Sequence, residues 1–160
     1  MRSALIGAAA VGLIVVGANY VTHTTPKRPI NVTTVVRRVN PGIVDVNSNL
    51  AFSDGGAAGT GIVLTPTGEV LTNNHVVAGS TSVKVVDVGN GRTYTATVVG
   101  TDRADDVAVL QMQNASGLST VSVGDSSRVA VGDSVAAFGN AGGVGGTPSV
   151  ASGHVTGLGQ

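Results

Sequence analysis

The stretch from Gly59 to Ala78 reads G-T-G-I-V-L-T-P-T-G-E-V-L-T-N-N-H-V-V-A. It holds two short runs rich in apolar and β-branched residues, Thr60–Thr65 and Glu69–Thr72, on either side of a Pro-Thr-Gly turn. Proline presets φ at such a turn and glycine accepts a positive φ, so the pattern predicts a β-hairpin. Runs of the same kind predict further strands at Ile43–Val46, Ser82–Val88, Arg92–Val99, Val107–Met112, Val135–Phe138 and Ser149–Val155.

The composition of the 160-residue chain also favours an all-β fold. Val, Ile and Thr make up about a third of the residues, whereas charged residues are only 11%, less than half of the roughly 25% in ordinary domains. Evenly spaced short strands without a long helix indicate a barrel or a sandwich rather than a parallel α/β sheet. Val32 to Val39 is expected to form one helical turn, which Asn40-Pro41-Gly42 ends.

Charge and rare residue types exclude several classes of function. Nine basic and nine acidic side chains give no net charge, so the sequence predicts no nucleic-acid partner. The absence of cysteine excludes disulfides, thiol catalysis and cysteine metal sites. The 3 histidines are too few and too widely spaced for a metal cluster, and we expect neither a metal nor another cofactor.

The N-terminus predicts export. Arg2 precedes an apolar segment, Ala4 to Ala18, which is short for a membrane span of about 20 residues and somewhat long for the core of a signal peptide, about 7–15 residues. We expect residues 1–21 to be an uncleaved membrane anchor, inserted through residues 4–21, or a signal peptide cleaved after Ala18. The body is then extracytoplasmic and anchored to the cell membrane, or it is secreted, with residues 22–42 as a tether.

Two segments carry candidate catalytic residues. In the first, His75 follows the end of a hydrophobic strand, where a fixed imidazole can act as a general base. In the second, Asp102, Asp105 and Asp106 precede an apolar strand. A carboxylate buried there is costly unless a partner receives it, and a catalytic histidine is such a partner. On residue chemistry alone, the three aspartates fit a solvated turn equally well.

Together the two segments resemble the HtrA/DegP type of trypsin-like serine proteases. The first segment has the sequence T-N-N-H-V-V, in which the histidine is His75. The second has the sequence D-x-x-x-D-V-A-V-L, in which the second aspartate is Asp106. Further similarity lies in Gly59–Leu64, Val131–Asn140 and Thr147–Thr156.

This resemblance implies a chymotrypsin/trypsin-like fold, with a complete first β-barrel at residues 43–118 and a second barrel only begun at 119–160. It places His75 as the general base and Asp106 as the acid that orients it. It also implies unfolded or extended polypeptide substrates and leaves oligomerisation open.

The nucleophile of this family is missing from the sequence. No G-[DN]-S-G-G-P motif follows Asp106, and the similar Gly139–Gly143 has alanine in place of serine and comes too early. Two further segments begin like this motif, Gly124-Asp125-Ser126 and Gly132-Asp133-Ser134. In both, the serine is not followed by the glycines whose backbone would help to form an oxyanion hole, so both are expected to be turns. We expect neither His23 nor His154 to be a ligand or a catalytic residue.

Two functions therefore remain open. In the first, the chain is the N-terminal part of an exported HtrA-like serine endopeptidase and is itself inactive because the serine is missing. Alternatively, it is a catalytically inactive barrel remnant that binds extended peptides or another chain at an open strand edge. Coding DNA beyond Gln160 that encodes the serine motif would favour the first, and a stop codon the second.

Overall fold

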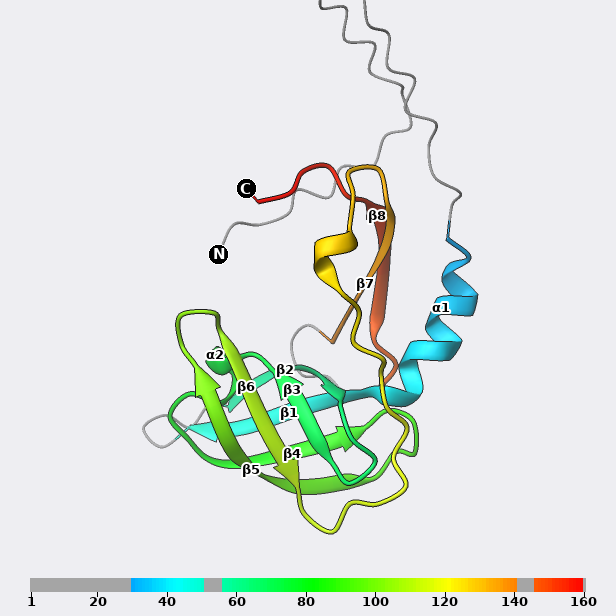
Figure 1. Ribbon diagram of the computed structural model, residues 1–160. Coiled ribbons are helices and arrows are strands. Elements are labelled where there is room, and N and C mark those ends of the chain that lie inside the picture. The colour runs from blue at the N-terminus through cyan, green and yellow to red at the C-terminus, as the bar shows by residue number, and fades with distance from the viewer. Residues whose placement is uncertain (1–29, 51–55, 141–145, 160) are drawn as a thin grey trace, which may run out of the picture.

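A computed structural model describes residues 30–50, 56–140 and 146–159 (Figure 1). The predicted N-terminal hydrophobic helix, the anchor at residues 4–21 and His23 lie outside the described residues. Within the described ranges, no helix is long and apolar enough to cross a membrane.

Six antiparallel strands close into a barrel, in the order β1-β2-β3-β6-β5-β4. This confirms the predicted all-β fold with a complete first barrel. All six strands that the sequence predicts in this region are present, with small differences at their ends. Their bounds are Ile43–Leu50 for β1, Gly56–Val63 for β2, Glu69–Thr72 for β3, Ser80–Asp87 for β4, Thr93–Asp102 for β5 and Val107–Met112 for β6.

The barrel interior is filled mainly by small branched side chains that alternate along the strands. In β6, Ala108, Leu110 and Met112 are buried, and the residues between them are only partly so. Fully burying a Val or Leu side chain stabilises a fold by about 1.5–3 kcal/mol. A valine-rich sequence with almost no aromatic residues can therefore still close a narrow six-stranded barrel. The interior valines are Val44, Val46, Val63, Val70, Val83 and Val85.

The turn between β2 and β3 forms as the Pro-Thr-Gly pattern predicts. The Gly68 amide donates to the Thr65 carbonyl at 3.0 Å, and Gly68 has φ +99°. A Cβ at this glycine would also lie 2.8 Å from the Ala115 Cβ. Conformation and space both require glycine there.

Helix α1, Val32–Val39, precedes the barrel and has the bounds that the sequence predicts, although its 8 residues make more than the single turn expected. Asn31 caps it by accepting a hydrogen bond from the Thr34 amide at 3.0 Å. The 3-10 helix η1, Asn40–Gly42, then leads directly into β1, because Pro41 cannot continue the α-helical hydrogen bonding.

A second, two-stranded sheet follows the barrel and stands apart from it (Figure 1). It pairs β7, Ser134–Gly139, with β8, Ser149–His154, after the short 3-10 helix η2, Ser126–Arg128. None of the side chains in these two strands is buried. This confirms that the second barrel is only begun.

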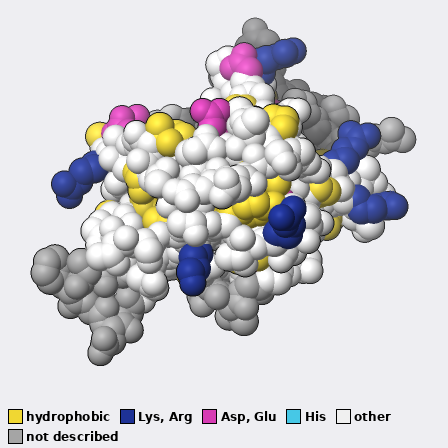
Figure 2. Space-filling model, turned by 90° about the horizontal axis from the view of Figure 1, so that it is seen from below, with side chains coloured by type: hydrophobic (Ala, Val, Ile, Leu, Met, Phe, Trp, Pro, Cys, Tyr) yellow, Lys and Arg dark blue, Asp and Glu magenta, His cyan; other side chains and the backbone are white. Residues whose placement is uncertain are grey.

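The outer surface of the barrel is mixed rather than strongly charged. Figure 2 shows apolar side chains between scattered Lys and Arg side chains on the face it presents. Val98 and Val99 of β5 are among the exposed apolar residues.

Candidate active site

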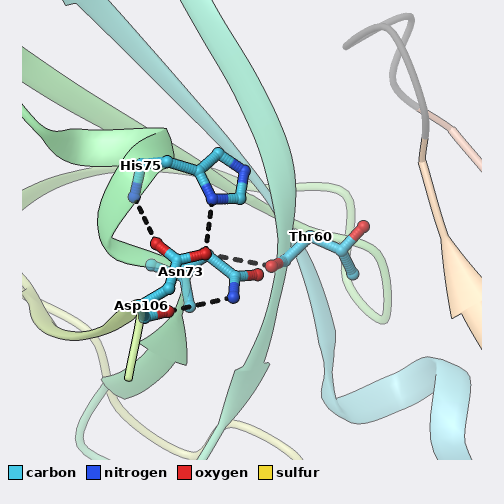
Figure 3. Close-up of polar contacts among 5 residues, drawn as sticks. Thr60, Asn73, His75 and Asp106 are labelled. Atoms are coloured by element: carbon cyan, nitrogen blue, oxygen red, sulfur yellow. Dashed lines mark hydrogen bonds and ion pairs between the residues drawn. The ribbon is translucent and has the colours of Figure 1, made fainter. Parts of the chain in front are cut away.

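His75 lies on α2, Asn74–Val77, a single helical turn between β3 and β4. Val76 and Val77 of the same turn are buried in the barrel core. This fixes α2 on the barrel, while the His75 side chain remains 70% exposed. The imidazole is thus exposed, and one of its ring nitrogens faces the Asp106 carboxylate (Figure 3).

Asp106 occupies the turn between β5 and β6 and binds His75 with both carboxylate oxygens. Its Oδ2 lies 2.6 Å from the His75 Nδ1, and its Oδ1 accepts the His75 backbone N–H at 2.8 Å. The Asp106 side chain is only 9% exposed. The structure therefore brings together the two residues that the sequence singled out, although 31 positions separate them.

The backbone carbonyl of Asp106 also fixes the start of α2. It accepts the Asn74 amide at 3.2 Å and the Asn73 side-chain Nδ2 at 3.0 Å. Asp106 has φ +54°, a conformation that is uncommon outside glycine and that Asp and Asn tolerate best. No role for Asn73 could be predicted from the sequence, because a side chain that donates to a backbone carbonyl leaves no recognisable pattern.

These contacts favour the ionised form of Asp106. The hydrogen bond from the His75 backbone N–H, followed by that from the His75 ring, lowers the pKa of the Asp106 carboxyl below its usual value. Because the carboxylate can only accept, the His75 Nδ1 must be the donor in their bond. The other ring nitrogen, Nε2, then carries a lone pair and is the atom that can take a proton.

The neighbouring aspartates behave as the alternative interpretation predicted. Asp102 accepts the backbone amides of Ala104 and Asp105 at 2.8 and 3.2 Å, which is the pattern of an exposed Asx turn. Asp105 is exposed as well. The solvated turn thus accounts for these two residues, and Asp106 alone reaches His75.

The two glycine-aspartate-serine motifs, expected to be turns, lie at the start of the 3-10 helix η2 and at the start of β7. Asp125 binds the Ser127 hydroxyl at 2.6 Å and its amide at 3.0 Å, and these bonds lower the pKa of Asp125. Ser134 begins β7, and its exposed hydroxyl lies 3.4 Å from His154 Nδ1 on β8. Among the residues that the structure describes, no group of three His, Cys, Asp or Glu could hold a metal ion.

Of the Gly139–Gly143 motif, only Gly139 and Asn140 lie in the described ranges. The Asn140 backbone N–H donates to the Thr60 Oγ1 at 2.9 Å, and its side-chain Nδ2 donates to the Asp45 Oδ1 at 2.9 Å. Asn140 therefore connects the end of β7 to the first barrel.

Comparison with known proteins identifies the family. The sequence profile of the trypsin-like peptidase domain matches residues 59–160. The chain belongs to this family.

Individual relatives are named as proteases of the HtrA and DegP type. The periplasmic serine endoprotease DegP of Escherichia coli K12 is 41% identical over 105 residues, which cover 65% of this chain and 22% of DegP. The serine protease PepD of Mycobacterium tuberculosis is 39% identical over 138 residues, which cover 81% of this chain and 29% of PepD. This chain therefore spans about a fifth to less than a third of the length of these relatives.

A solved structure agrees with the sequence matches. An HtrA-type protease, AlgW with a tripeptide, superposes with a TM-score of 0.73 at 29% identity, covering 82% of this chain and 41% of AlgW. The resemblance to HtrA/DegP proteases and the trypsin-like fold are thus confirmed. The chain matches the N-terminal part of the protease domain.

Proposed function

We propose that this chain supplies the general base and the orienting acid of an HtrA-like serine endopeptidase. The observation that carries the proposal is the 2.6 Å contact between the exposed ring of His75 and the buried carboxylate of Asp106. Asp106 holds the ring in the tautomer with the proton on Nδ1 and stabilises the imidazolium that forms. Nε2 of His75 takes the proton of a serine hydroxyl as it attacks a peptide carbonyl, and returns it to the leaving amine.

In this proposal the serine lies outside residues 1–160, because no motif within them fits the nucleophile of the family. The proposed substrates are unfolded or extended polypeptides, in keeping with relatives named endoproteases and with the tripeptide in the AlgW structure. The chemistry requires no cofactor.

We also propose that the protein is exported, because several relatives are named periplasmic. In this arrangement, residues 1–21 are the signal peptide or anchor and residues 22–42 the tether. The first barrel, 43–118, then carries both site residues, and 119–160 begins the second barrel.

A hybrid protein tests the proposal. In this hybrid, Gln160 is joined to the nucleophile-bearing remainder of the DegP protease domain, and labelling by a serine-reactive fluorophosphonate is measured together with peptide hydrolysis. His75→Ala should abolish both signals, and Asp106→Asn should lower hydrolysis by orders of magnitude, because the ring then adopts the wrong tautomer. Asp105→Asn, which removes an exposed carboxylate next to Asp106, should leave both unchanged. Hydrolysis that survives His75→Ala in a folded hybrid would contradict the proposal.

A second candidate function rests on the two-stranded sheet. Each of β7 and β8 pairs with only one strand in the described structure, so each leaves an edge that can template another strand. A catalytically inactive chain could use such an edge to bind an extended peptide or another chain. Saturable binding of a fluorescent extended peptide, combined with an inactive hybrid protein, would favour this second function.

A further inference from the structure

Ser48 is a polar side chain at an interior position of β1. It continues the alternation that places Val44 and Val46 inside the barrel, and it is only 1% exposed. A hydroxyl in such a place destabilises the fold unless it has a hydrogen-bond partner. Its Oγ donates to the Val76 carbonyl at 2.6 Å, and the Ala57 carbonyl is 3.4 Å away.

The Val76 carbonyl needs a donor from outside its own helix. Because α2 ends at Val77, the carbonyls of its last residues have few partners within the helix. Val76 directly follows His75 and is buried, so water cannot readily replace the missing donor. Ser48 supplies that donor from a strand 28 positions earlier in the sequence.

The packing below α2 brings this carbonyl to Ser48. Gly59 of β2 lies directly under Val76, and a Cβ at Gly59 would be 2.5 Å from the Val76 Cγ2. The absence of a side chain at Gly59 lets α2 sit close against β2. Asp106 then accepts the His75 backbone N–H, and Ser48 donates to the carbonyl of the next residue, Val76.

We propose that Ser48 is a positioning residue for His75. Its hydroxyl fixes the orientation of α2, and thereby the direction from which the imidazole reaches Asp106. Without this bond the buried Val76 carbonyl loses its donor, α2 shifts to find another, and the Nδ1–Oδ2 contact lengthens. The effect of Ser48 on catalysis rests on the proposed function, whereas its effect on the geometry of His75 does not.

Nuclear magnetic resonance of the full chain tests the geometry. In the unchanged protein, the Ser48 hydroxyl proton should exchange slowly and show a nuclear Overhauser effect to the residues around the Val76 carbonyl. In Ser48→Ala, hydrogen exchange of the His75 amide should accelerate about tenfold, and the downfield Nδ1–H resonance of His75 should move or broaden. Ser48→Cys, which keeps the volume but donates weakly, should give the same change to a smaller extent.

Thr81→Ala is the matched control. The Thr81 hydroxyl also donates to a strand carbonyl, that of Asn49 at 3.3 Å, but this bond is exposed and does not involve α2. It should leave the His75 signals unchanged. The Val85 amide in β4 reports on the barrel as a whole and should keep its protection in all variants.

The outcomes separate the two proposals. A fast-exchanging Ser48 hydroxyl in the unchanged chain, or unchanged His75 signals in a folded Ser48→Ala variant, would overturn the positioning role. In the hybrid protein, Ser48→Ala should lower kcat about tenfold with little change in KM. A hybrid that is inactive even with Ser48 present would contradict the proposed function alone, because the effect on His75 is measured without a nucleophile.

Discussion

At the scale of the residue, Asp106 makes stability depend on pH. Hydrogen bonds from His75 lower the pKa of its carboxyl in the folded state, so the unfolded chain binds the proton more readily. The stabilisation is therefore present above the usual value of 3.8 and is lost as pH falls through the lowered folded pKa. Urea unfolding should show the unchanged protein more stable than Asp106→Asn at pH 7, with the difference shrinking below about pH 4.

Asparagine is the appropriate replacement in that experiment, because it tolerates the positive φ of Asp106 nearly as well as aspartate does. Asp105→Asn serves as the control and should follow the unchanged protein across the whole pH range. A difference between the protein and Asp106→Asn that stays constant down to pH 2 would count against this linkage.

His75 and Asp106 could be predicted as a pair because their two motifs resemble those of HtrA/DegP proteases, whereas residue chemistry alone did not distinguish Asp106 from a solvated turn. Their supporting residues could not be predicted. Asn73 and Ser48 act through backbone carbonyls, and a hydrogen bond to a carbonyl places no demand on the residue type at the other end. The left-handed conformation of Asp106 is likewise invisible in the sequence, where glycine is the usual sign of it.

At the scale of the element, Gly59 determines how closely α2 packs on β2. Gly59→Ala places a methyl group 2.5 Å from the Val76 Cγ2, and such overpacking should lower the free energy of unfolding by about 1–3 kcal/mol. Gly100→Ala in β5 is the matched control, because a Cβ there meets nothing within 4 Å. It should leave the stability unchanged or raise it by up to about 1 kcal/mol. Urea unfolding that shows equal stability for both variants would contradict this account.

The strands that the sequence predicts all occur, and the errors lie at their ends. β1 continues through Asn47-Ser48-Asn49 to Leu50, past the predicted end at Val46. These polar residues pair with β4 through their backbone, and Ser48 also faces the interior, so hydrophobic periodicity underestimates the strand. β5 likewise extends to Asp102 through a register irregularity between Val98 and Gly100.

At the scale of the whole molecule, the 160-residue chain contains the proposed base, His75, and the proposed orienting acid, Asp106, but no recognisable nucleophile motif. We expect the purified chain not to hydrolyse peptides and not to react with a fluorophosphonate, since the covalent step requires an activated serine and an oxyanion hole. The decisive comparison is between the chain and His75→Ala. If the unchanged chain is labelled and His75→Ala is not, a serine within this sequence is the nucleophile.

The two sheets should differ sharply in stability. The barrel has a continuous core and no open edge, whereas β7 and β8 form a two-stranded sheet, which is marginal in water without further packing. Asn140 fastens this sheet to the barrel through Thr60 and the buried Asp45. Because β7 lies in the two-stranded sheet and β6 in the barrel, hydrogen exchange should show strong protection in β6 and weaker protection in β7.

Asn140→Ala tests this attachment. It removes the side-chain donor to the Oδ1 of Asp45. The other carboxylate oxygen, Oδ2, is already buried and has no hydrogen-bond partner among the described residues. The loss should lower the free energy of unfolding of the barrel by about 1–3 kcal/mol, because a buried acceptor is left unsatisfied. Protection in β7 should fall further, while β6 remains the most protected strand. Equal protection of β6 and β7 in the monomer, before and after the substitution, would mean that the second sheet does not depend on Asn140 and is stable by itself.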